Sequence, residues 1–365
     1  MTYDFLIVGA GPAGCVLAER LARGSDQRVL LIDRRDHIAG NAYDYVNEAG
    51  LYVQQYGPHI FHTTLEHVWD YLSQFTAWNG YVHRVLARVD NKLVNLPISL
   101  ETMELLYDRS FTSDELKAWF EQRKIAVERI ENARDVVVAQ VGEELYELLF
   151  ENYTKKQWGL DPEQLAAEVT ERLPVRYDRD TRYFAEPYQG LPCEGFTALF
   201  ERMISHPNIT VRLETEYPHD VASQTYRQLI YTGPIDAFFD YAFGPLPYRS
   251  LAFEFATLDT EWFQPAGVVN YPNDEDYTRI TEFKHLYRQQ HARTTVCYEY
   301  GAAEGPPYYP IPTPANRQLY GAYQARADAL DGVHFLGRLA QYEYLNLDHV
   351  VGRALQLYDR IRTRD

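Results

Sequence analysis

The 365-residue chain has little cysteine, no long apolar run and a deficit of positive charge. Its three cysteines, Cys15, Cys193 and Cys297, are odd in number and far apart. This pattern fits neither a disulfide framework nor a zinc site, and it favours a reducing compartment. No apolar stretch approaches the ~20 residues that a membrane-spanning helix needs, and the first expected strand begins at residue 3, which leaves no room for a signal peptide. We therefore expect a cytoplasmic protein with no membrane insertion.

The charge balance limits the partners that the chain can have. Lys and Arg number 35 and Asp and Glu number 52, so the net charge is -17. Such a chain is a poor match for nucleic acid or an anionic membrane. A small anionic ligand stays possible, because exposed charges are screened within about 8 Å and local arginines control their own pocket. Tyrosine is abundant, with 30 residues against 3 Met; it suits pockets for sugars, bases and phosphates, although most of these side chains are expected to pack in the core.

The amino-terminal segment has a strand, a glycine-rich turn, a helix and a second strand. Residues 3–8 predict a buried strand, residues 12–23 a helix and residues 28–33 a second buried strand. The first strand runs directly into G-x-G-x-x-G, and Asp33 ends the second. This order predicts an adenine dinucleotide site, whereas the glycine motif alone would also fit a turn that binds nothing.

Each residue of the turn has a physical task. Gly9 permits the tight turn, Gly11 lets the backbone approach a pyrophosphate, and Gly14 lets the helix pack on the strand. Free N–H groups and the dipole at the helix start favour the negative pyrophosphate. Asp33 is placed to accept a hydrogen bond from a ribose hydroxyl.

The rest of the chain predicts insertions into this dinucleotide-binding unit. Residues 65–75 predict a helix, and residues 81–97 predict a hairpin with a turn at Asp90 and Asn91. Residues 99–168 predict a mainly helical block, in which Thr112 and Glu115 form a capping box at a helix start. Strand patterns dominate from residue 248 to 300. The fold class that we predict is α/β, with an FAD-binding Rossmann-like domain, an inserted helical domain and an antiparallel β-sheet domain. The predicted domains are residues 1–64 with 190–246 and 315–365 for FAD, 65–189 for a mainly helical substrate domain with a mobile loop near 165–178, and 247–314 for the antiparallel sheet.

This layout favours FAD over NAD. A nicotinamide dehydrogenase usually completes its site with a second Rossmann half directly downstream. Here the chain returns to the first sheet only near its end, with a strand at residues 333–337 followed by Arg338. The closing helix, residues 347–362, can then direct its N-terminus at a flavin ring and favour negative charge there.

Several motifs carry a more specific resemblance. They are Gly40-Asn-Ala-Tyr-Asp44, Tyr56-Gly-Pro-His-Ile-Phe-His-Thr63, Asn152-Tyr-Thr-Lys-Lys-Gln-Trp158, Arg172-Leu-Pro-Val-Arg176, Arg182-Tyr-Phe184, Tyr277-Thr-Arg-Ile-Thr-Glu282 and Gly337-Arg338. In these motifs and their order the chain resembles the bacterial UDP-galactopyranose mutases, flavoenzymes that interconvert UDP-galactopyranose and UDP-galactofuranose. It departs from them at Ala39, where relatives often have Gly, at His83, where they often have Asn, and at Asn346, where others have Asp.

The resemblance implies the substrate site. Phe150, Tyr153, Thr154 and Trp158 share one helix face that mixes hydroxyls with aromatic rings, which a dry core would avoid. The expected catalytic residues are Arg172 on a mobile loop and Arg279 on a fixed wall, which together clamp the diphosphate, and His62 near the flavin and the sugar. The expected substrate-binding residues are His83, Phe150, Tyr153, Thr154, Trp158, Tyr183, Asn270, Tyr309 and Tyr344. Among them, Phe150 and Tyr153 are expected to flank the uracil. The hydroxyls of Tyr183, Tyr309 and Tyr344 are expected to donate to the phosphates.

The resemblance and the turn together imply the cofactor site. Its expected residues are Gly9, Gly11, Pro12, Gly14, Asp33, Arg34, Gly40, Asn41, His59, Arg338, Leu345 and Asn346. His59 and His62 are close in sequence, but no Cys, Asp or Glu cluster supports a metal site. We therefore expect FAD and no metal.

The chain shows no Ser-His-Asp grouping and no paired-carboxylate motif, so the cofactor is expected to supply the chemistry. The resemblance implies that the N5 atom of reduced flavin attacks the anomeric carbon of UDP-galactopyranose, with no net redox change. Two alternatives stay open at this point. One is a flavin-dependent amine or alcohol oxidoreductase of the same architecture, and the other is a protein-binding relative of the Rab-GDP dissociation inhibitor group. A homodimer is expected from the family.

Overall fold

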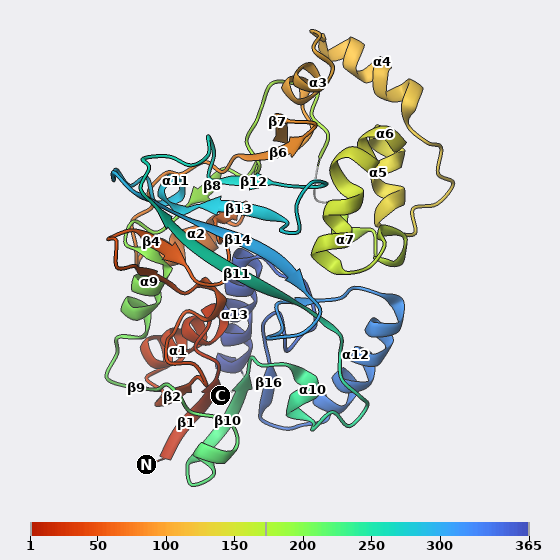
Figure 1. Cartoon of the computed structure of the whole chain (residues 1–365). Coiled ribbons are helices and arrows are strands. Elements are labelled where there is room, and N and C mark those ends of the chain that lie inside the picture. Colours follow the sequence, from red (N-terminus) through yellow and green to blue (C-terminus); the bar gives the residue numbers. More distant parts are fainter. Residues whose placement is uncertain (1, 172–173, 364–365) are drawn as a thin grey trace.

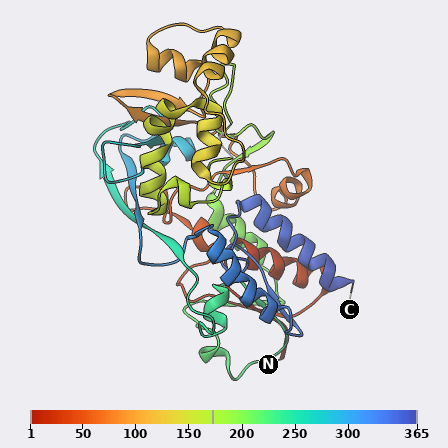
Figure 2. The same cartoon turned by 90° about the vertical axis from the view of Figure 1, so that its right-hand side faces the viewer.

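The first sheet has five parallel strands at the end of the molecule where both termini lie (Figures 1 and 2). A computed structural model describes residues 2–171 and 174–363. The strand order is β16-β10-β1-β2-β9, and every neighbouring pair is parallel. The strands are β1 (Thr2–Val8), β2 (Val29–Ile32), β9 (Ile209–Arg212), β10 (Thr225–Tyr231) and β16 (Val333–Phe335). The two strands predicted around the glycine turn are confirmed.

Helices α1 (Pro12–Ser25) and α13 (Leu347–Arg362) pack against each other beside this sheet, and α9 (Gly195–Ile204) packs on α1. Buried apolar side chains from these helices and from β1 and β2 form one core, which includes Phe5, Val16, Leu31, Phe196 and Val351. The first and last helices of the chain therefore stabilise the same sheet, as the Rossmann-like prediction requires.

A second sheet of seven strands crosses above the first (Figure 1). Its order is β15-β11-β14-β13-β12-β6-β7, and its pairs are antiparallel except for β12 with β6. The strands are β6 (Val85–Val89), β7 (Lys92–Leu96), β11 (Tyr248–Leu258), β12 (Val268–Asn270), β13 (Arg279–Glu282), β14 (Thr294–Ala302) and β15 (Tyr309–Pro310). The hairpin predicted at residues 81–97 is present and joins this sheet, although the sequence groups it with the helical block.

The helical block lies at the far end from the termini, to the right and top of Figure 1. Its elements are α3 (Leu100–Tyr107), α4 (Ser113–Arg123), α5 (Ala133–Val141), α6 (Glu143–Tyr146), a π-helical turn η2 (Glu147–Glu151), α7 (Asn152–Trp158), a 3-10 turn η3 (Pro162–Gln164) and α8 (Glu168–Glu171). The capping box predicted at Thr112 and Glu115 begins α4. Apolar residues of these helices and of the hairpin form a core of their own. The predicted loop near residues 165–178 contains α8, while Arg172 and Leu173 lie outside the described residues.

The remaining elements connect these layers. They are β3 (Asp44–Val46), β4 (Tyr52–Gln54), β5 (Phe61–Thr63), β8 (Tyr188–Gly190), α2 (Glu66–Ser73), α10 (Ile235–Phe238), α11 (Phe283–Tyr287), α12 (Pro314–Ala327), and the 3-10 turns η1 (Gly40–Ala42) and η4 (His219–Val221). Helices α9 and α12 are findings that the sequence patterns did not predict. The division into three domains stays a prediction.

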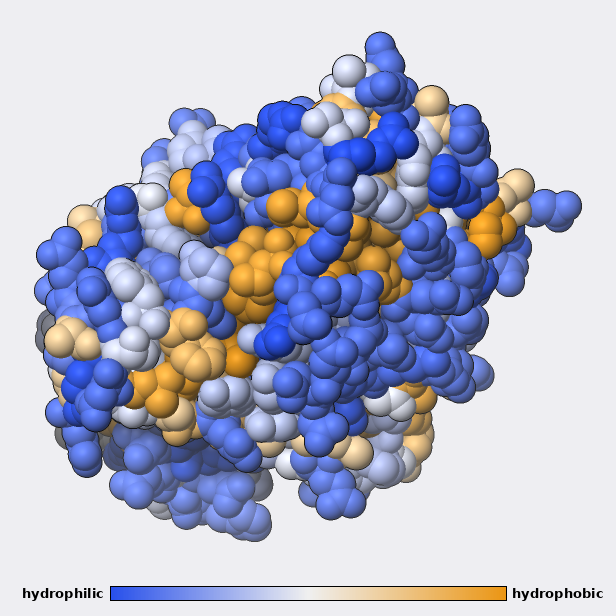
Figure 3. All heavy atoms as spheres, turned by 45° about the horizontal axis from the view of Figure 1, so that its top comes forward, coloured by the Kyte–Doolittle hydropathy of each residue, from blue (hydrophilic) through white to orange (hydrophobic). Residues whose placement is uncertain are grey.

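Hydrophilic residues cover most of the face drawn in Figure 3, in keeping with the charge of the chain. Figure 3 shows a face on which apolar residues gather at the centre while hydrophilic residues surround and partly cross them. Among residues 2–171 and 174–363, no helix has the length and apolar character to cross a bilayer.

Candidate active site

One cavity of about 1200 Å³ joins the glycine turn to helix α7. It exceeds the ~300–1,000 Å³ typical of a site for a single small ligand. Every predicted site residue in the described chain lines it except Gly14, which lies inside helix α1. The predicted residues on its wall are Gly9, Gly11, Pro12, Asp33, Arg34, Gly40, Asn41, His59, His62, His83, Phe150, Tyr153, Thr154, Trp158, Tyr183, Asn270, Arg279, Tyr309, Arg338, Tyr344, Leu345 and Asn346.

The turn has the geometry of an anion cradle. Gly9 has φ +105°, and a Cβ at Gly14 would stand 1.9 Å from the Gly9 carbonyl oxygen, so only glycine fits there. Gly11 is the N-cap of α1 and supplies no side-chain acceptor, so no side chain caps the first N–H groups of that helix. Such N–H groups favour a phosphate. These features fit a bound dinucleotide.

Asp33 is already engaged by the backbone. Its Oδ2 accepts a hydrogen bond from Ala10 N at 2.8 Å and its Oδ1 accepts one from Arg35 N at 2.9 Å. A carboxylate oxygen has two acceptor sites, so each oxygen retains one for a ribose hydroxyl. The turn and the end of β2 are therefore held in a fixed relation.

His59 and Arg338 lie on the same wall of the cavity. His59 Nδ1 is 3.0 Å from the Gly57 carbonyl oxygen, and burial, together with the charge of Arg338, lowers the pKa of His59 to about 4. Arg338 donates to the Leu345 carbonyl oxygen at 2.6 Å. Asn346 is the N-cap of α13, and its side chain makes no capping hydrogen bond. Since Asn346 also lines the cavity, an uncharged residue stands where this helix begins.

The helix face predicted to bind the nucleotide is preceded by a π-helical turn. Phe150 lies in η2, whereas Tyr153, Thr154 and Trp158 lie in α7. π-Bulges are uncommon and often occur at functional sites. All four residues line the cavity, which agrees with the predicted shared face.

Two cationic side chains connect α7 to the second sheet and its loops by hydrogen bonds. Lys156 Nζ donates to the Glu275 carbonyl oxygen at 2.8 Å and also contacts the Tyr271 carbonyl oxygen. Arg249, on β11, donates from Nε to the Gln157 carbonyl oxygen at 2.9 Å and from Nη2 to the Lys156 carbonyl oxygen at 3.0 Å. Positive charge at a helix C-terminus opposes the negative end of the dipole. These hydrogen bonds hold α7 beside the strands β12 and β13, which carry Asn270 and Arg279.

Arg279 is paired with a buried carboxylate. Its Nε and Nη2 donate to Glu299 Oε2 at 3.0 and 2.8 Å. Burial lowers the pKa of Arg279, but Glu299 and the nearby Tyr153 and Tyr309 hydroxyls outweigh this effect and raise it well above the usual value. The guanidinium is therefore always charged, and Glu299 fixes its direction.

An aromatic cluster stands beside these arginines. Tyr309 and Tyr344 are stacked with ring centroids 5.4 Å apart, and Trp158 lies 5.9 Å from Tyr309. The Arg338 guanidinium lies 5.3 Å from the Tyr309 ring and 5.0 Å from the Tyr344 ring. The structure thus brings two of the three tyrosines predicted to bind phosphate, Tyr309 and Tyr344, to a cationic part of the cavity.

His62 forms a hydrogen bond with a carboxylate that the sequence did not predict. Its Nδ1 lies 3.1 Å from Glu186 Oε1, and its ring stacks on Phe184 at 3.6 Å. Burial lowers the pKa of His62, and the charge of Glu186 opposes this. Glu186 and Phe184 also line the cavity.

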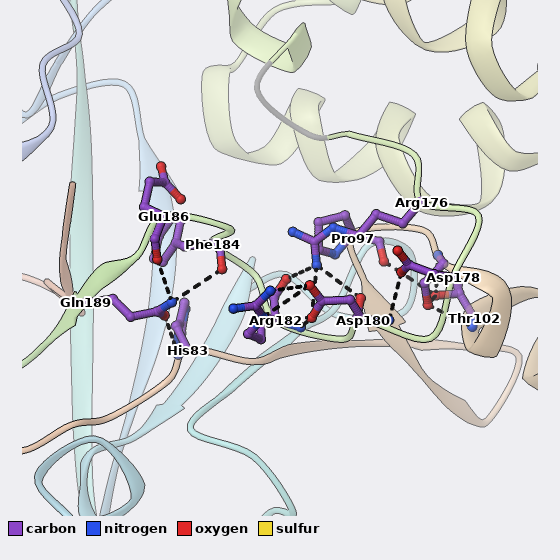
Figure 4. A network of polar contacts seen from close by, with 11 residues as sticks. His83, Pro97, Thr102, Arg176, Asp178, Asp180, Arg182, Phe184, Glu186 and Gln189 are labelled. Atoms are coloured by element: carbon purple, nitrogen blue, oxygen red, sulfur yellow. Dashed lines mark hydrogen bonds and ion pairs between the residues drawn. The ribbon is translucent and has the colours of Figure 1, made fainter. Parts of the chain in front are cut away.

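His83 is held by the segment that carries Tyr183 and Phe184. Its backbone N donates to Gln189 Oε1 at 3.3 Å, and its carbonyl oxygen accepts from Tyr183 N at 2.7 Å. Gln189 Nε2 in turn donates to the Glu186 carbonyl oxygen at 3.1 Å, as Figure 4 shows. Asn270 is buried opposite Arg279 in the β12–β13 register.

The adjoining loop is tied by a second polar group (Figure 4). Arg176 donates to the Asp180 carbonyl oxygen at 3.0 Å, and Asp180 accepts from Arg182 Nη2 at 2.7 Å. Arg176 N also donates to the Ile98 carbonyl oxygen at 2.9 Å. Arg172, predicted to close over the substrate, lies outside the described residues.

Sequence reasoning missed several residues that line the cavity at the carboxyl ends of the parallel strands. Thr215 and Tyr217 follow β9, and Thr232 follows β10. A signal was available, because the carboxyl ends of parallel strands meet at one edge, where ligands bind. Glu186 and Tyr308 gave no such signal. In the described ranges no group of three or more His, Cys, Asp or Glu side chains could hold a metal.

Known proteins match both parts of this cavity. The sequence profile of the UDP-galactopyranose mutase family matches residues 148–344, and that of an NAD(P)-binding Rossmann-like domain matches residues 7–75. A probable UDP-galactopyranose mutase of Klebsiella pneumoniae is 38% identical over 98% of this chain and 94% of its own length. A dTDP-fucopyranose mutase of Escherichia coli is 34% identical over 96% of each chain.

A solved structure of reduced UDP-galactopyranose mutase matches the fold with a TM-score of 0.80 at 17% identity, over 100% of this chain and 96% of that one. The family and the dinucleotide-binding fold together indicate a flavin cofactor. Because the profile covers more than half of the chain and the relatives align over nearly all of it, the chain belongs to the UDP-galactopyranose mutase family.

Proposed function

We propose that this chain is a UDP-galactopyranose mutase that holds FAD, is active when the flavin is reduced, and interconverts UDP-galactopyranose and UDP-galactofuranose. One observation carries the proposal: one cavity joins a dinucleotide cradle to an aromatic and hydroxyl-bearing helix face through a partly buried, charged arginine. The volume of about 1200 Å³ is large enough for a cofactor and a nucleotide sugar together. We further propose a cytoplasmic homodimer, from the family and the cysteine content.

The cofactor fits the residues at one end. The uncapped start of α1 would hold its pyrophosphate, Asp33 a ribose hydroxyl, and the start of α13 with Asn346 the ring. When bound and reduced, the flavin supplies a nucleophilic N5 for the anomeric carbon, which agrees with the lack of a protein nucleophile in the sequence motifs.

The protein's own groups would bind and retain UDP. Arg279 would donate charge-assisted hydrogen bonds to the diphosphate, with its direction fixed by Glu299. Tyr309 and Tyr344 would add hydroxyl donors, and Phe150 and Tyr153 would flank the uracil. Keeping UDP next to the sugar lowers the cost of its return, which is the proximity effect. Arg172 would supply a second cation and exclude water when its loop closes.

The test is an assay of the purified holoenzyme with UDP-galactopyranose, with and without dithionite. Conversion to the furanose only after reduction supports the proposal, whereas full activity with oxidised flavin contradicts it. A parallel assay with dTDP-fucopyranose separates the two activities named in the family, and oxygen consumption during turnover would identify an oxidase instead.

Arginine variants test the assigned roles. Arg279→Ala and Arg172→Ala should each abolish most turnover and leave the flavin content unchanged, because neither is assigned to the cofactor. Arg293→Ala is the matched control, since Arg293 is an exposed arginine paired with Asp259 at the surface. Near wild-type turnover of either test variant would show that its arginine is misassigned.

A further inference from the structure

One ring nitrogen of His62 is bonded to a carboxylate inside the cavity. His62 lies on β5, and its Nδ1 is 3.1 Å from Glu186 Oε1. Glu186 lies two residues after Phe184, in the segment that leads into β8. All three side chains line the cavity. The motifs that carry the family resemblance end at Phe184 in this part of the chain, so the resemblance assigns no role to Glu186.

This hydrogen bond fixes which nitrogen of a neutral His62 ring carries the hydrogen. A carboxylate accepts hydrogen bonds and cannot donate them. Nδ1 must therefore be the donor to Glu186, and a neutral ring with its hydrogen on Nδ1 has a lone pair at Nε2. No residue in the described ranges forms a hydrogen bond with Nε2. This acceptor is thus left for a ligand.

The surroundings hold the ring and the carboxylate in a fixed relation. The His62 side chain is 11% exposed, and its ring stacks on Phe184 with centroids 3.6 Å apart. Strands β5 and β8 pair with His62 opposite Gln189. Gln189 Nε2 donates to the Glu186 carbonyl oxygen at 3.1 Å, and Figure 4 shows it between Glu186 and Phe184. The segment that contacts the ring is therefore tied to the strand that carries the ring.

The His62 ring is neutral at neutral pH. Burial lowers its pKa, and Glu186 acts in the opposite direction by its charge and its hydrogen bond. Asp348 and His349, in the first turn of α13, also act on the pKa, the first raising it and the second lowering it. His83 is a further titratable group within range. Since the net shift is downward, one hydrogen is shared between two nitrogens, and its place matters.

The location of His62 gives this arrangement a use. Its ring is near the start of α13, the part of the cavity assigned to the flavin ring in the proposed function. A lone pair at Nε2 can accept a hydrogen bond from an N–H or O–H of a ligand. The opposite tautomer would direct a hydrogen at the same ligand group and repel it. A carboxylate that selects the tautomer therefore decides what the ring can bind.

We infer that Glu186 is a positioning residue, which keeps the hydrogen of His62 on Nδ1 and so presents Nε2 as an acceptor to a ligand N–H or O–H. The inference rests on the proposed function, because it deepens the role of a residue expected to act beside the flavin and the sugar. Direct contact of the Glu186 carboxylate with the ligand is the alternative that the experiment separates from it.

The first measurement is nitrogen NMR of oxidised holoenzyme with isotopically labelled histidine rings. The variant His62→Gln identifies the His62 signals by their loss. In wild type at neutral pH, Nδ1 should be the protonated nitrogen and Nε2 the unprotonated one. Glu186→Met keeps the length of the side chain and removes the acceptor, so the fraction with hydrogen on Nδ1 should fall. The pKa of His62 should fall as well, because Glu186 raises it in wild type.

The second measurement is the kcat and KM of reduced holoenzyme with UDP-galactopyranose. Glu186→Met should lower kcat about 10-fold with little change in KM or flavin content, as expected for one hydrogen bond to a charged group. In the His62→Gln background the same substitution should have little further effect, because Glu186 acts through His62. Glu66→Met is the matched control. Glu66 accepts from the hydroxyl of Tyr188 on β8 at 3.1 Å but does not line the cavity, so this variant should match wild type.

Three results would overturn the inference. The first is a wild-type His62 ring with its hydrogen on Nε2, and the second is a wild-type kcat for Glu186→Met. The third is an equal loss of kcat from Glu186→Met with and without His62, which would assign a direct ligand contact to the carboxylate. Wild type that does not convert UDP-galactopyranose would instead refute the proposed function, while the NMR spectra would still report the tautomer. The two failures are thus distinguishable.

Discussion

The C-terminal anchor of α7 allows a quantitative prediction. Arg249 is 9% exposed, and its guanidinium donates to the Gln157 and Lys156 carbonyl oxygens at 2.9 and 3.0 Å. Its pKa is lowered by burial, and no carboxylate in the described chain is within ion-pair distance of it. The replacement Arg249→Met keeps the apolar stem and removes both bonds.

The change in the free energy of unfolding combines the loss of these hydrogen bonds with the removal of a buried cation. Each hydrogen bond to a charged group contributes ~1.5–3 kcal/mol, and the carbonyl groups left buried lose their partners. Removing a desolvated cation offsets part of this, so a net loss of about 3 kcal/mol is expected. At ~2.1 cal/mol/K per residue, a chain of 365 residues has an unfolding entropy of about 0.8 kcal/mol/K, and its Tm falls by about 4 °C.

The function should fall with the stability, because Trp158 and Thr154 lie in the turn that Arg249 anchors. We expect UDP to bind the holoenzyme about 10-fold more weakly, which corresponds to ~1.4 kcal/mol. Calorimetry gives both quantities, as the Tm of the protein and the Kd of UDP. Arg293→Met, at an exposed surface pair, is the control and should change neither.

A substitution at Gly301 should disturb the same end of α7 by steric contact instead of by loss of hydrogen bonds. A Cβ at Gly301 on β14 would stand 2.1 Å from the Lys156 carbonyl oxygen, so Gly301→Ala should push the helix end away and weaken UDP binding in the same way. The reasoning is refuted if Arg249→Met lowers the Tm while UDP affinity stays at the wild-type value, because α7 would then not depend on this anchor for its binding geometry.

Two further predictions concern the cradle and the thiols. Gly14→Ala should yield protein with little bound flavin, because the added Cβ would stand 1.9 Å from the Gly9 carbonyl oxygen; visible flavin absorbance at the wild-type ratio to protein would contradict this. Only Cys193 should react rapidly with a thiol reagent in the native protein, since it is exposed while Cys15 and Cys297 are buried and burial raises their thiol pKa values. All three should react after denaturation, and rapid native labelling of more than one thiol would show that the core opens.

Local signals predicted the elements that depend on local chemistry. The glycine turn, the capping box at Thr112 and the turn at Asp90 and Asn91 each satisfy neighbouring backbone groups, so their residue types are readable from the sequence. Asp90 and Asn91 adopt φ of 48° and 61°, a conformation that these residue types tolerate better than most. The hairpin follows from this turn without any tertiary information.

Long-range pairing was not predictable in this way. Strand β6 runs parallel to β12, which is far away in sequence, and thereby brings His83 toward Asn270 and Arg279. Nothing in the hairpin itself indicates this partner, because its alternation specifies a buried face but not a neighbour. Helix α12 was missed although Thr313 caps its start and Pro314 follows, because only Tyr323 and Ala327 of the helix are buried and its apolar face is too narrow to give a clear helical period.

The partners of the arginines were likewise not predictable from the sequence. Arg249, Arg279 and Arg338 look alike in the sequence, yet the structure gives them different partners: two helix carbonyls, a carboxylate, and carbonyls beside two tyrosine rings. The pair of Arg279 with Glu299 is neutral as a unit, so at long range it attracts a diphosphate only weakly. At short range, however, Glu299 holds the Arg279 guanidinium in one orientation, so that its remaining N–H groups can donate hydrogen bonds to phosphate oxygens. In a chain of charge -17, net attraction for the anion must therefore come from cations that no carboxylate balances. Arg338 donates to carbonyl oxygens and pairs with no carboxylate among the described residues, so we expect it to add affinity for the diphosphate that Arg279 alone cannot supply.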